Sequence, residues 1–432
     1  MQQTLLGQIL IKFGMLTEAQ LLDALRLQTR SHPGRYLGEL LIEQGILEPR
    51  ALESILSVQR RRLGLQQAQG RLTSSQVEER LSHAALPAFL HVARDMGASD
   101  LYVTSGLRPI VRLHGNLVDL PVEPLTFEQS KTLLFSVLDE DDVAAYYARK
   151  SLDRSVNVEG AGRFRLNVFR HLRGIAGIFR TLADAPRTLQ ELGLPPVVEE
   201  LTNCDHGLVL VTGPAGSGKS TTLSAIVDRI NRTRSVHVLT VEDPIEVLHE
   251  SYKAFVTQRE VTTHTDSPAS ALRSALRADP DVLVVGELRD PEMVSTAITA
   301  AETGHLVFAT LHTSSAANTI LRIVDQFPAQ KRNHVRMMLA SSLRGVVSQL
   351  LVPNLDGRGR SLACEVLVST PAVTRLIRDD RVWQIPSAMQ MGAQQGMRLM
   401  DDALLDLVRS RRITLDEALA HAVERDKFLQ RP

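Results

Sequence analysis

The chain has 432 residues, too many for one ordinary hydrophobic core, so two to four domains are expected. Its 49 lysines and arginines balance 49 aspartates and glutamates, which argues against a general nucleic-acid or anionic-membrane surface. Only Cys204 and Cys364 are cysteines, which excludes a disulfide framework and a four-cysteine zinc site and fits a reducing cytoplasm. No apolar run approaches the roughly 18–20 residues of a membrane span, and no secretion signal is visible. We therefore expect a soluble, cytoplasmic, multidomain protein.

The first sixty residues contain one unit written twice. Leu6-Gly7-x-x-Leu10 recurs as Leu37-Gly38-x-x-Leu41, an offset of 31 residues that the later leucine and glutamine positions also follow. Each copy reads as two short helices around a turn, so residues 1–62 are predicted to form a helical two-repeat domain. Residues 63–84 are polar and rich in Arg, Gln and Ser, which predicts a linker.

A mixed α/β pattern follows over residues 85–185, and it predicts a small α/β domain. Its strand-like segments are Ser99–Thr104, Pro109–His114, Asp153–Val158, Arg163–Phe169 and Gly174–Arg180.

Residues 186–330 change to an alternation of strand, loop and helix. The short apolar segments Leu208–Val211, Val236–Val241, Val282–Val285 and Leu306–Thr310 read as buried strands of a parallel sheet. This order is typical of a doubly wound α/β nucleotide-binding domain. Beyond about Pro328 we expect a mostly helical region, residues 331–432.

A complete phosphate-loop motif, GPAGSGKST, follows the first of these strands and precedes a helix-compatible run. A chance glycine-rich turn is the alternative, but strand before and helix after argue against it. Backbone N–H groups of such a loop wrap a polyphosphate, Lys219 would reach the β- and γ-phosphates, and the Ser220 hydroxyl would bind Mg²⁺. The predicted ATP-binding residues are Gly213, Pro214, Ala215, Gly216, Ser217, Gly218, Lys219, Ser220 and Thr221.

Three further segments carry carboxylates or histidines around the ends of predicted strands: TVEDPIE (240–246), LRADPDVLVVGELRD (276–290) and TGHLVFATLHT (303–313). Carboxylates after such strands suit a Mg²⁺ ligand or a base that orients water. Taken singly, Glu246 and Glu287 could equally be solvated carboxylates, and His305 and His312 could be structural.

Together these segments resemble the type II secretion and type IV pilus motor ATPase superfamily, over roughly Ala98 to Gly396. GPAGSGKST is similar to its Walker A loop, TVEDPIE to its Asp box, DVLVVGELRD to its Walker B segment and TGHLVFATLHT to its His box. The resemblance implies a RecA-like P-loop core preceded by a small PAS-like α/β domain. It also implies a Mg²⁺-dependent ATPase.

The resemblance further implies roles for single residues. Glu246 would be the base that orients the attacking water, Glu287 would support Mg²⁺ or water, and His305 and His312 would sense the γ-phosphate. Family members also place arginines of the preceding domain near the nucleotide, because the guanidinium fork matches phosphate oxygens. The candidates in this chain are Arg163, Arg165 and Arg180.

Within the superfamily the chain resembles the PilT-type pilus retraction ATPases. With two cysteines it cannot carry the tetracysteine zinc module usual in assembly and secretion motors. The segment AVTRLIRD (372–379) is similar to the retraction-associated helix AIRNLIRE. This implies a cytoplasmic hexamer, peripheral at the inner membrane, that retracts a pilus through an inner-membrane platform protein.

The N-terminal repeat instead resembles the cyclic-di-GMP-binding domain of assembly and secretion ATPases. Leu5 and Tyr36 stand where that motif has arginine, and neither can pair with a phosphate. We therefore favour a module that docks to a partner over one that binds cyclic-di-GMP. Alternatives are an assembly or secretion motor, a nucleotide-gated signalling adaptor, and a DNA-translocating motor. The neutral charge weakens the last of these, so no nucleic-acid partner is expected.

Overall fold

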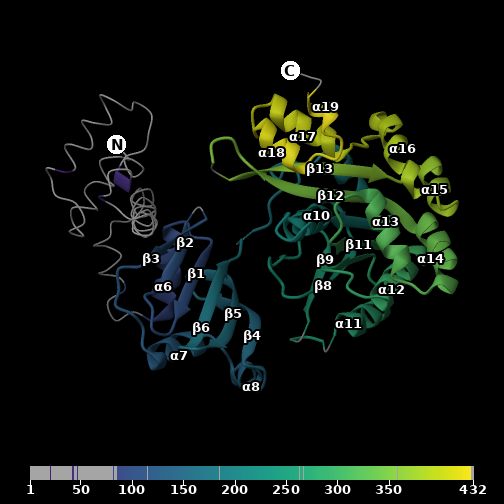
Figure 1. Cartoon of the computed structure of the whole chain (residues 1–432). Coiled ribbons are helices and arrows are strands. Elements are labelled where there is room, and N and C mark those ends of the chain that lie inside the picture. The colour runs from purple at the N-terminus through teal and green to yellow at the C-terminus, as the bar shows by residue number, and fades with distance from the viewer. Residues whose placement is uncertain are drawn as a thin grey trace. The chain divides into compact units, whose positions relative to one another are not determined.

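A computed structural model describes residues 85–429 except positions 114, 184, 262, 266 and 358, together with positions 20, 41, 42, 46 and 81. The chain divides into two compact units, Met1–Leu182 and Ala183–Pro432 (Figure 1). The predicted two-repeat domain and the linker lie outside the described residues, apart from those five positions. None of the helices described is both long and apolar enough to cross a membrane.

The first unit contains a six-stranded antiparallel sheet in the order β3-β2-β1-β6-β5-β4. Along β5 the side chains of Phe164, Leu166 and Val168 are buried, and they alternate with half-buried polar residues on the other face. The strands are β1 (Asp100–Thr104), β2 (Ile110–Leu113), β3 (Asn116–Asp119), β4 (Ser151–Val158), β5 (Gly162–His171) and β6 (Gly174–Thr181). All five strands predicted here are confirmed to within two residues at each end, whereas the short β3 was not predicted.

Three helices accompany this sheet: α6 (Leu86–Asp95), α7 (Phe127–Phe135) and α8 (Glu140–Arg149). Helix α7 begins with a capping box, in which the Thr126 side chain accepts from the Gln129 N–H and the Gln129 side chain accepts from the Thr126 N–H. Asp139 caps α8 in the same way by accepting from the Asp142 N–H. Leu86, Phe89 and Leu90 of α6 join the buried apolar cluster of the sheet.

The second unit is built on a seven-stranded sheet in the order β13-β12-β7-β11-β10-β8-β9. Neighbouring strands from β12 to β9 are parallel, and β13 is antiparallel to β12. The strands are β7 (Gly207–Thr212), β8 (His237–Glu242), β9 (Phe255–Glu260), β10 (Val282–Val285), β11 (Leu306–Leu311), β12 (Leu343–Pro353) and β13 (Arg360–Val368). The four predicted parallel strands are confirmed.

Helices connect these strands and continue to the end of the unit. They are α9 (Pro196–Leu201), α10 (Lys219–Thr233), α11 (Pro268–Ala275), η1 (Leu276–Ala278), α12 (Pro291–Glu302), α13 (Ala316–Asp325), α14 (Ala329–Ser342), α15 (Pro371–Arg378), η2 (Val382–Gln384), α16 (Ile385–Met391), η3 (Ala393–Gln395), α17 (Met400–Arg409), α18 (Leu415–His421) and α19 (Asp426–Leu429).

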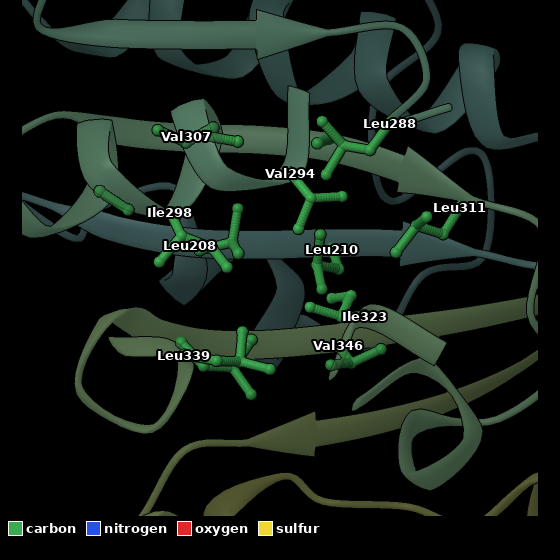
Figure 2. Packing of buried hydrophobic residues seen from close by; sticks show 14 of the residues in the cluster. Leu208, Leu210, Leu288, Val294, Ile298, Val307, Leu311, Ile323, Leu339 and Val346 are labelled. Atoms are coloured by element: carbon green, nitrogen blue, oxygen red, sulfur yellow. The ribbon is translucent and has the colours of Figure 1, made fainter. Parts of the chain in front are cut away.

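The two faces of this sheet are both apolar and both covered. Leu208 and Leu210 of β7 point to one face, where Figure 2 shows them among Val294 and Ile298 of α12 and Ile323 of α13. The alternate residues of β7 join a second cluster with side chains of α10. Burying each such side chain contributes about 1.5–3 kcal/mol. Helices on both faces of a largely parallel sheet confirm the doubly wound α/β architecture.

The prediction of a mostly helical C-terminal region missed two strands, β12 and β13. Helices do occupy much of residues 329–429, but β12 extends the parallel sheet beside β7. Its sequence, LRGVVSQLLVP, is a short apolar run, and periodicity alone does not separate a buried strand from a buried helix. The correction matters for the site because β12 supports the phosphate loop.

Candidate active site

The carboxyl ends of β7, β11, β10 and β8 lie at one edge of the sheet. These strands are parallel and in register, with Thr212 opposite Leu311, and Val285 opposite both Ala309 and Val241. The phosphate loop, the Walker B-like segment, the Asp box-like segment and the His box-like segment each continue from one of these ends. Topology therefore brings together four motifs that are far apart in the sequence.

The phosphate loop connects β7 to α10 and has a backbone that suits glycine. Gly213 has φ 145° and Gly218, the N-cap of α10, has φ 92°. A Cβ atom at Gly213 would lie 2.3 Å from the Gln349 carbonyl oxygen of β12. The loop is held from the same strand by a bond of 2.8 Å between the hydroxyls of Thr212 and Ser348.

Lys219, the first residue of α10, folds back over the loop. Its Nζ donates to the carbonyl oxygens of Gly213 at 2.8 Å and Pro214 at 2.9 Å. The side chain is buried, and this burial lowers the pKa of Lys219, while the nearby carboxylate of Glu287 raises it. The ammonium is thus placed inside the loop, where a polyphosphate would be wrapped.

His312 joins the phosphate loop to the end of β10. Its Nδ1 lies 3.4 Å from Lys219 Nζ, and its Nε2 lies 3.1 Å from Glu287 Oε1. Because an ammonium can only donate, Nδ1 accepts and Nε2–H donates to the carboxylate. His312 therefore bridges the Lys219 ammonium and the Glu287 carboxylate.

Hydrogen bonds of the neighbouring backbone and a contact with Arg289 hold Glu287 in place. The Gly286 N–H donates to Val241 O at 2.8 Å, and the Leu288 N–H donates to Thr310 O at 3.0 Å. Arg289 Nε donates to Glu287 Oε2 at 3.0 Å, and Arg289 Nη1 donates to Asp243 Oδ2 at 3.1 Å. One chain of polar contacts therefore runs from Lys219 through His312, Glu287 and Arg289 to Asp243.

Glu246 lies in the segment after β8, which begins with a cis peptide bond between Asp243 and Pro244. Glu242, the last residue of β8, is close enough to Glu246 for their charges to interact. Burial raises the pKa of Glu242; hydrogen bonds from Thr240 and Gln258 lower it, and the charges of Glu246 and Glu260 raise it. This corner of the edge therefore brings the carboxyl groups of Glu242, Glu246 and Glu260 close together.

Comparison with known proteins agrees with this geometry. Residues 188–398 match the family described as type II/IV secretion system protein. The type IV pilus retraction ATPase PilT of Pseudomonas aeruginosa is 46% identical over 332 residues, covering 77% of this chain and 96% of PilT. A twitching motility protein of Neisseria gonorrhoeae is 45% identical over 314 residues, covering 73% of this chain and 84% of that protein.

A crystal structure of the pilus retraction motor PilT with bound ADP superposes with a TM-score of 0.76 at 42% identity, covering 81% of this chain and all of that one. The ATPase DotB of Legionella pneumophila follows with 0.67 at 29% identity, covering 78% and 95%. The chain belongs to the type II/IV secretion ATPase family. Its relatives within this family include PilT-type ATPases, so ATP hydrolysis and nucleotide binding are its general activity.

Not all predicted site residues meet at the carboxyl edge of the sheet. His305 and His312 flank β11, a strand of six residues that spans about 17 Å. His305 lies at the amino end, where its Nδ1 lies 3.0 Å from the Ala300 carbonyl oxygen, and where Thr303 Oγ1 lies 3.4 Å from the same nitrogen. His305 and His312 thus lie at opposite ends of β11, with His305 away from the phosphate loop of its own chain, and a role of His305 as a γ-phosphate sensor stays a prediction.

The three predicted arginines belong to the first unit, on β5 and β6. Arg165 and Arg180 lie opposite each other in the ladder, and each has a carboxylate partner within the unit. Arg165 makes a two-pronged contact with Asp153, at 3.1 and 2.6 Å, and Arg180 Nε donates to Asp100 at 2.9 Å. Arg163 precedes them on the same face of β5. Contact of any of them with nucleotide stays a prediction.

Several residues that the sequence did not single out support the site. Arg289 lies in the Walker B-like segment, between Glu287 and Asp290, and an arginine among carboxylates was the one sequence feature that could have indicated its role. Gln349 Nε2 donates to Thr222 Oγ1 of α10 at 2.8 Å, and Arg360 Nη1 donates to Gly216 O at 3.3 Å. Gln349 lies on β12 and Arg360 on β13; neither segment was predicted as a strand, so no local pattern indicated that these residues lie at the phosphate loop.

Proposed function

We propose that this chain is a Mg²⁺-dependent ATPase that works as a homohexamer at the cytoplasmic face of the inner membrane and retracts type IV pili through an inner-membrane platform protein. The observation that carries the proposal is the contact chain from Lys219 to Asp243, which joins all four motifs at one sheet edge. The similarity to PilT over nearly the whole length of that protein supports the choice of retraction.

The predicted residues at the carboxyl edge have the following roles in this proposal. Lys219 and the backbone N–H groups of residues 215–221 hold the phosphates, and the N-terminus of α10 adds favourable partial charge. Glu246 accepts a proton from the attacking water as the γ-phosphoryl group departs. His312 contacts both Lys219 and the Glu287 carboxylate, so a change at the γ-phosphate that moves Lys219 also changes the contact of His312 with Glu287.

The residues present fit a magnesium ion bound together with nucleotide. In the described part of the chain no three His, Cys, Asp or Glu side chains form a metal site by themselves. Mg²⁺ in nucleotide sites takes one or two protein oxygens and completes its shell with phosphates and water. Ser220, exposed beside Lys219, and Glu287 are the residues that would hold it. When bound, the ion neutralises charge on the phosphates.

The chemistry is tested by Glu246→Gln. This substitution removes the base but keeps the size of the side chain, so ATP affinity should stay within about threefold while kcat falls on the order of 100-fold or more. If the variant instead binds ATP weakly but hydrolyses bound ATP at the wild-type kcat, the assignment of Glu246 as the base is wrong.

The direction of the motor is tested by deleting the gene. Surface pili that are retained but no longer retract, with loss of twitching, are expected. Absence of pili would identify an assembly motor instead, and intact pili with a defect in protein export would identify a secretion motor.

The first sixty residues are proposed to dock to a partner of the motor. Isothermal titration of cyclic-di-GMP into the full chain should show no binding at micromolar concentrations, because Leu5 and Tyr36 replace the cationic positions of the resembling motif. Saturable binding would favour the nucleotide-gated adaptor.

A further inference from the structure

The segment that carries Glu246 connects β8 to β9, and side chains of β9 hold it. Gln258 of β9 uses both ends of its carboxamide here. Its Nε2 donates to Glu242 Oε1 at 3.0 Å and to Val247 O at 2.9 Å, while its Oε1 accepts from the His249 N–H at 2.8 Å. One side chain therefore ties the end of β8 to the backbone of Val247 and His249, one and three residues after Glu246.

Glu260, two residues further along β9, holds the other side of Glu246. Its Oε2 accepts from the Ile245 N–H at 2.9 Å, and its Oε1 accepts from Thr263 Oγ1 at 2.9 Å. Residues two apart on a strand share a face, so Gln258 and Glu260 reach the segment together. The backbone immediately before and immediately after Glu246 is thus bonded to β9.

A third contact ties the same segment to the phosphate-loop helix. His249 Nε2 lies 3.3 Å from the Ser224 hydroxyl of α10, the helix that begins with Lys219. The Gln258 carboxamide holds the His249 backbone, so it also sets where this contact forms. The segment around Glu246 is therefore tied both to β9 and to the helix that follows the phosphate loop.

We propose that Gln258 is a positioning residue for ATP hydrolysis, which holds the backbone around Glu246 so that this carboxylate meets the attacking water. The proposal rests on the role assigned to Glu246 above. Gln258 need not touch nucleotide: its contacts are to Glu242, Val247 and His249. Small displacements of a catalytic group reduce rates steeply, since a shift of about 1 Å can cost about 100-fold.

The test is Gln258→Met in the full chain, which keeps the length of the side chain and removes all three hydrogen bonds. We expect kcat for ATP to fall on the order of 10- to 100-fold, with KM and ATP affinity within about threefold, because the phosphate loop is untouched. Thr257→Val is the matched control. Thr257 lies next to Gln258 but on the other face of β9, where its hydroxyl lies 3.1 Å from His237 Nε2, and kcat should be unchanged.

The decisive readout is the double variant. If Gln258 acts through Glu246, adding Gln258→Met to Glu246→Gln should lower the residual kcat by less than about twofold, because the group being positioned is already gone. A full additional 10-fold loss in that background would overturn the proposal, as would a rise in KM with kcat unchanged. If Glu246→Gln itself hydrolyses ATP normally, the proposed role of Glu246 fails, and the positioning role fails with it.

Gln258→Glu guards against misfolding of the first variant. It keeps the acceptor for the His249 N–H and loses the donors to Glu242 and Val247, so the same fall in kcat without a change in KM is expected. Wild-type kcat in a folded Gln258→Glu protein would contradict the proposal.

Discussion

The two edges of the seven-stranded sheet carry the same kinds of side chain but use them differently. At the amino edge, His206, Asp281 and His305 each stand directly before a strand. Asp281 accepts from the His237 N–H at 2.8 Å, His305 Nδ1 lies 3.0 Å from Ala300 O, and Arg344 donates to the His206 carbonyl at 3.1 Å. Most of these contacts are to backbone groups; the exception is the His206 side chain, whose Nε2 lies 3.0 Å from Arg344 Nη2.

At the carboxyl edge the polar side chains mostly contact one another. His312 lies between Lys219 and Glu287, and Arg289 lies between Glu287 and Asp243. Such contacts can be exchanged for contacts to a ligand without unravelling a strand or helix. In parallel sheets this edge also faces helix N-termini, so an anion is favoured there and not at the other edge. The difference teaches that the end of the strand, more than the residue type, decides which histidine or carboxylate can serve catalysis.

The largest effect that would sharpen this comparison is expected for Lys219→Ala. Removing the ammonium from the loop should abolish ATP turnover, by on the order of 1,000-fold, because no other described side chain donates to the carbonyl oxygens of both Gly213 and Pro214. Steady-state phosphate release measures it. Hydrolysis within tenfold of the wild type would break the assignment of the carboxyl edge.

A smaller effect is expected for the arginines of the two edges. Arg289→Ala should reduce kcat roughly 10-fold, since it frees the Glu287 and Asp243 carboxylates, and should change the free energy of unfolding by less than about 0.5 kcal/mol because the pairs are exposed. Arg344→Ala should do the reverse: it removes bonds to backbone carbonyls at about 1–2 kcal/mol and leaves kcat unchanged. Urea unfolding and phosphate release separate the two outcomes, and identical profiles for both variants would remove the distinction.

The prediction with the smallest effect on turnover is one of stability at acid pH, and it concerns His249 near the carboxyl edge. Burial lowers the pKa of His249 from 6.5 to about 4, while Asp228 opposes the shift. Between pH 6.5 and about pH 4, His249 is therefore protonated in the unfolded chain but neutral in the folded chain. The free energy of unfolding falls as the pH drops through this window, by up to about 3 kcal/mol.

His249→Gln should flatten that part of the curve of unfolding free energy against pH. A variant whose stability falls as steeply as that of the wild type between pH 6.5 and 4 would show that another group titrates there.

Much of the site could be predicted from the sequence because its motifs are local. The phosphate loop is contiguous, and Glu246, Glu287 and His312 follow short apolar strands whose buried, parallel character is visible in their residues. Arg289 and Gln258 could not be assigned roles in this way. Their contacts depend on the order of strands in the sheet and on β9 pairing with β8, and no local spacing encodes either.

The distance of His305 from the phosphate loop has a simple physical origin. Two histidines in one short segment suggest one site, but seven positions along an extended chain put them at opposite ends of a strand. The strand β12 was not predicted for a different reason: a short apolar run with a central Ser-Gln pair has no periodicity that separates strand from helix. Its support of the phosphate loop became visible only with the fold.

The comparison of the two edges is tested most directly by replacing the two histidines of β11 separately. His312→Ala and His305→Ala differ only in the end of the strand that they affect, and kcat for ATP is measured for both alongside the melting temperature. The account predicts that His312→Ala lowers kcat at least 10-fold while His305→Ala stays within about twofold of the wild type. Equal losses in both variants, or a loss confined to His305→Ala, would contradict it.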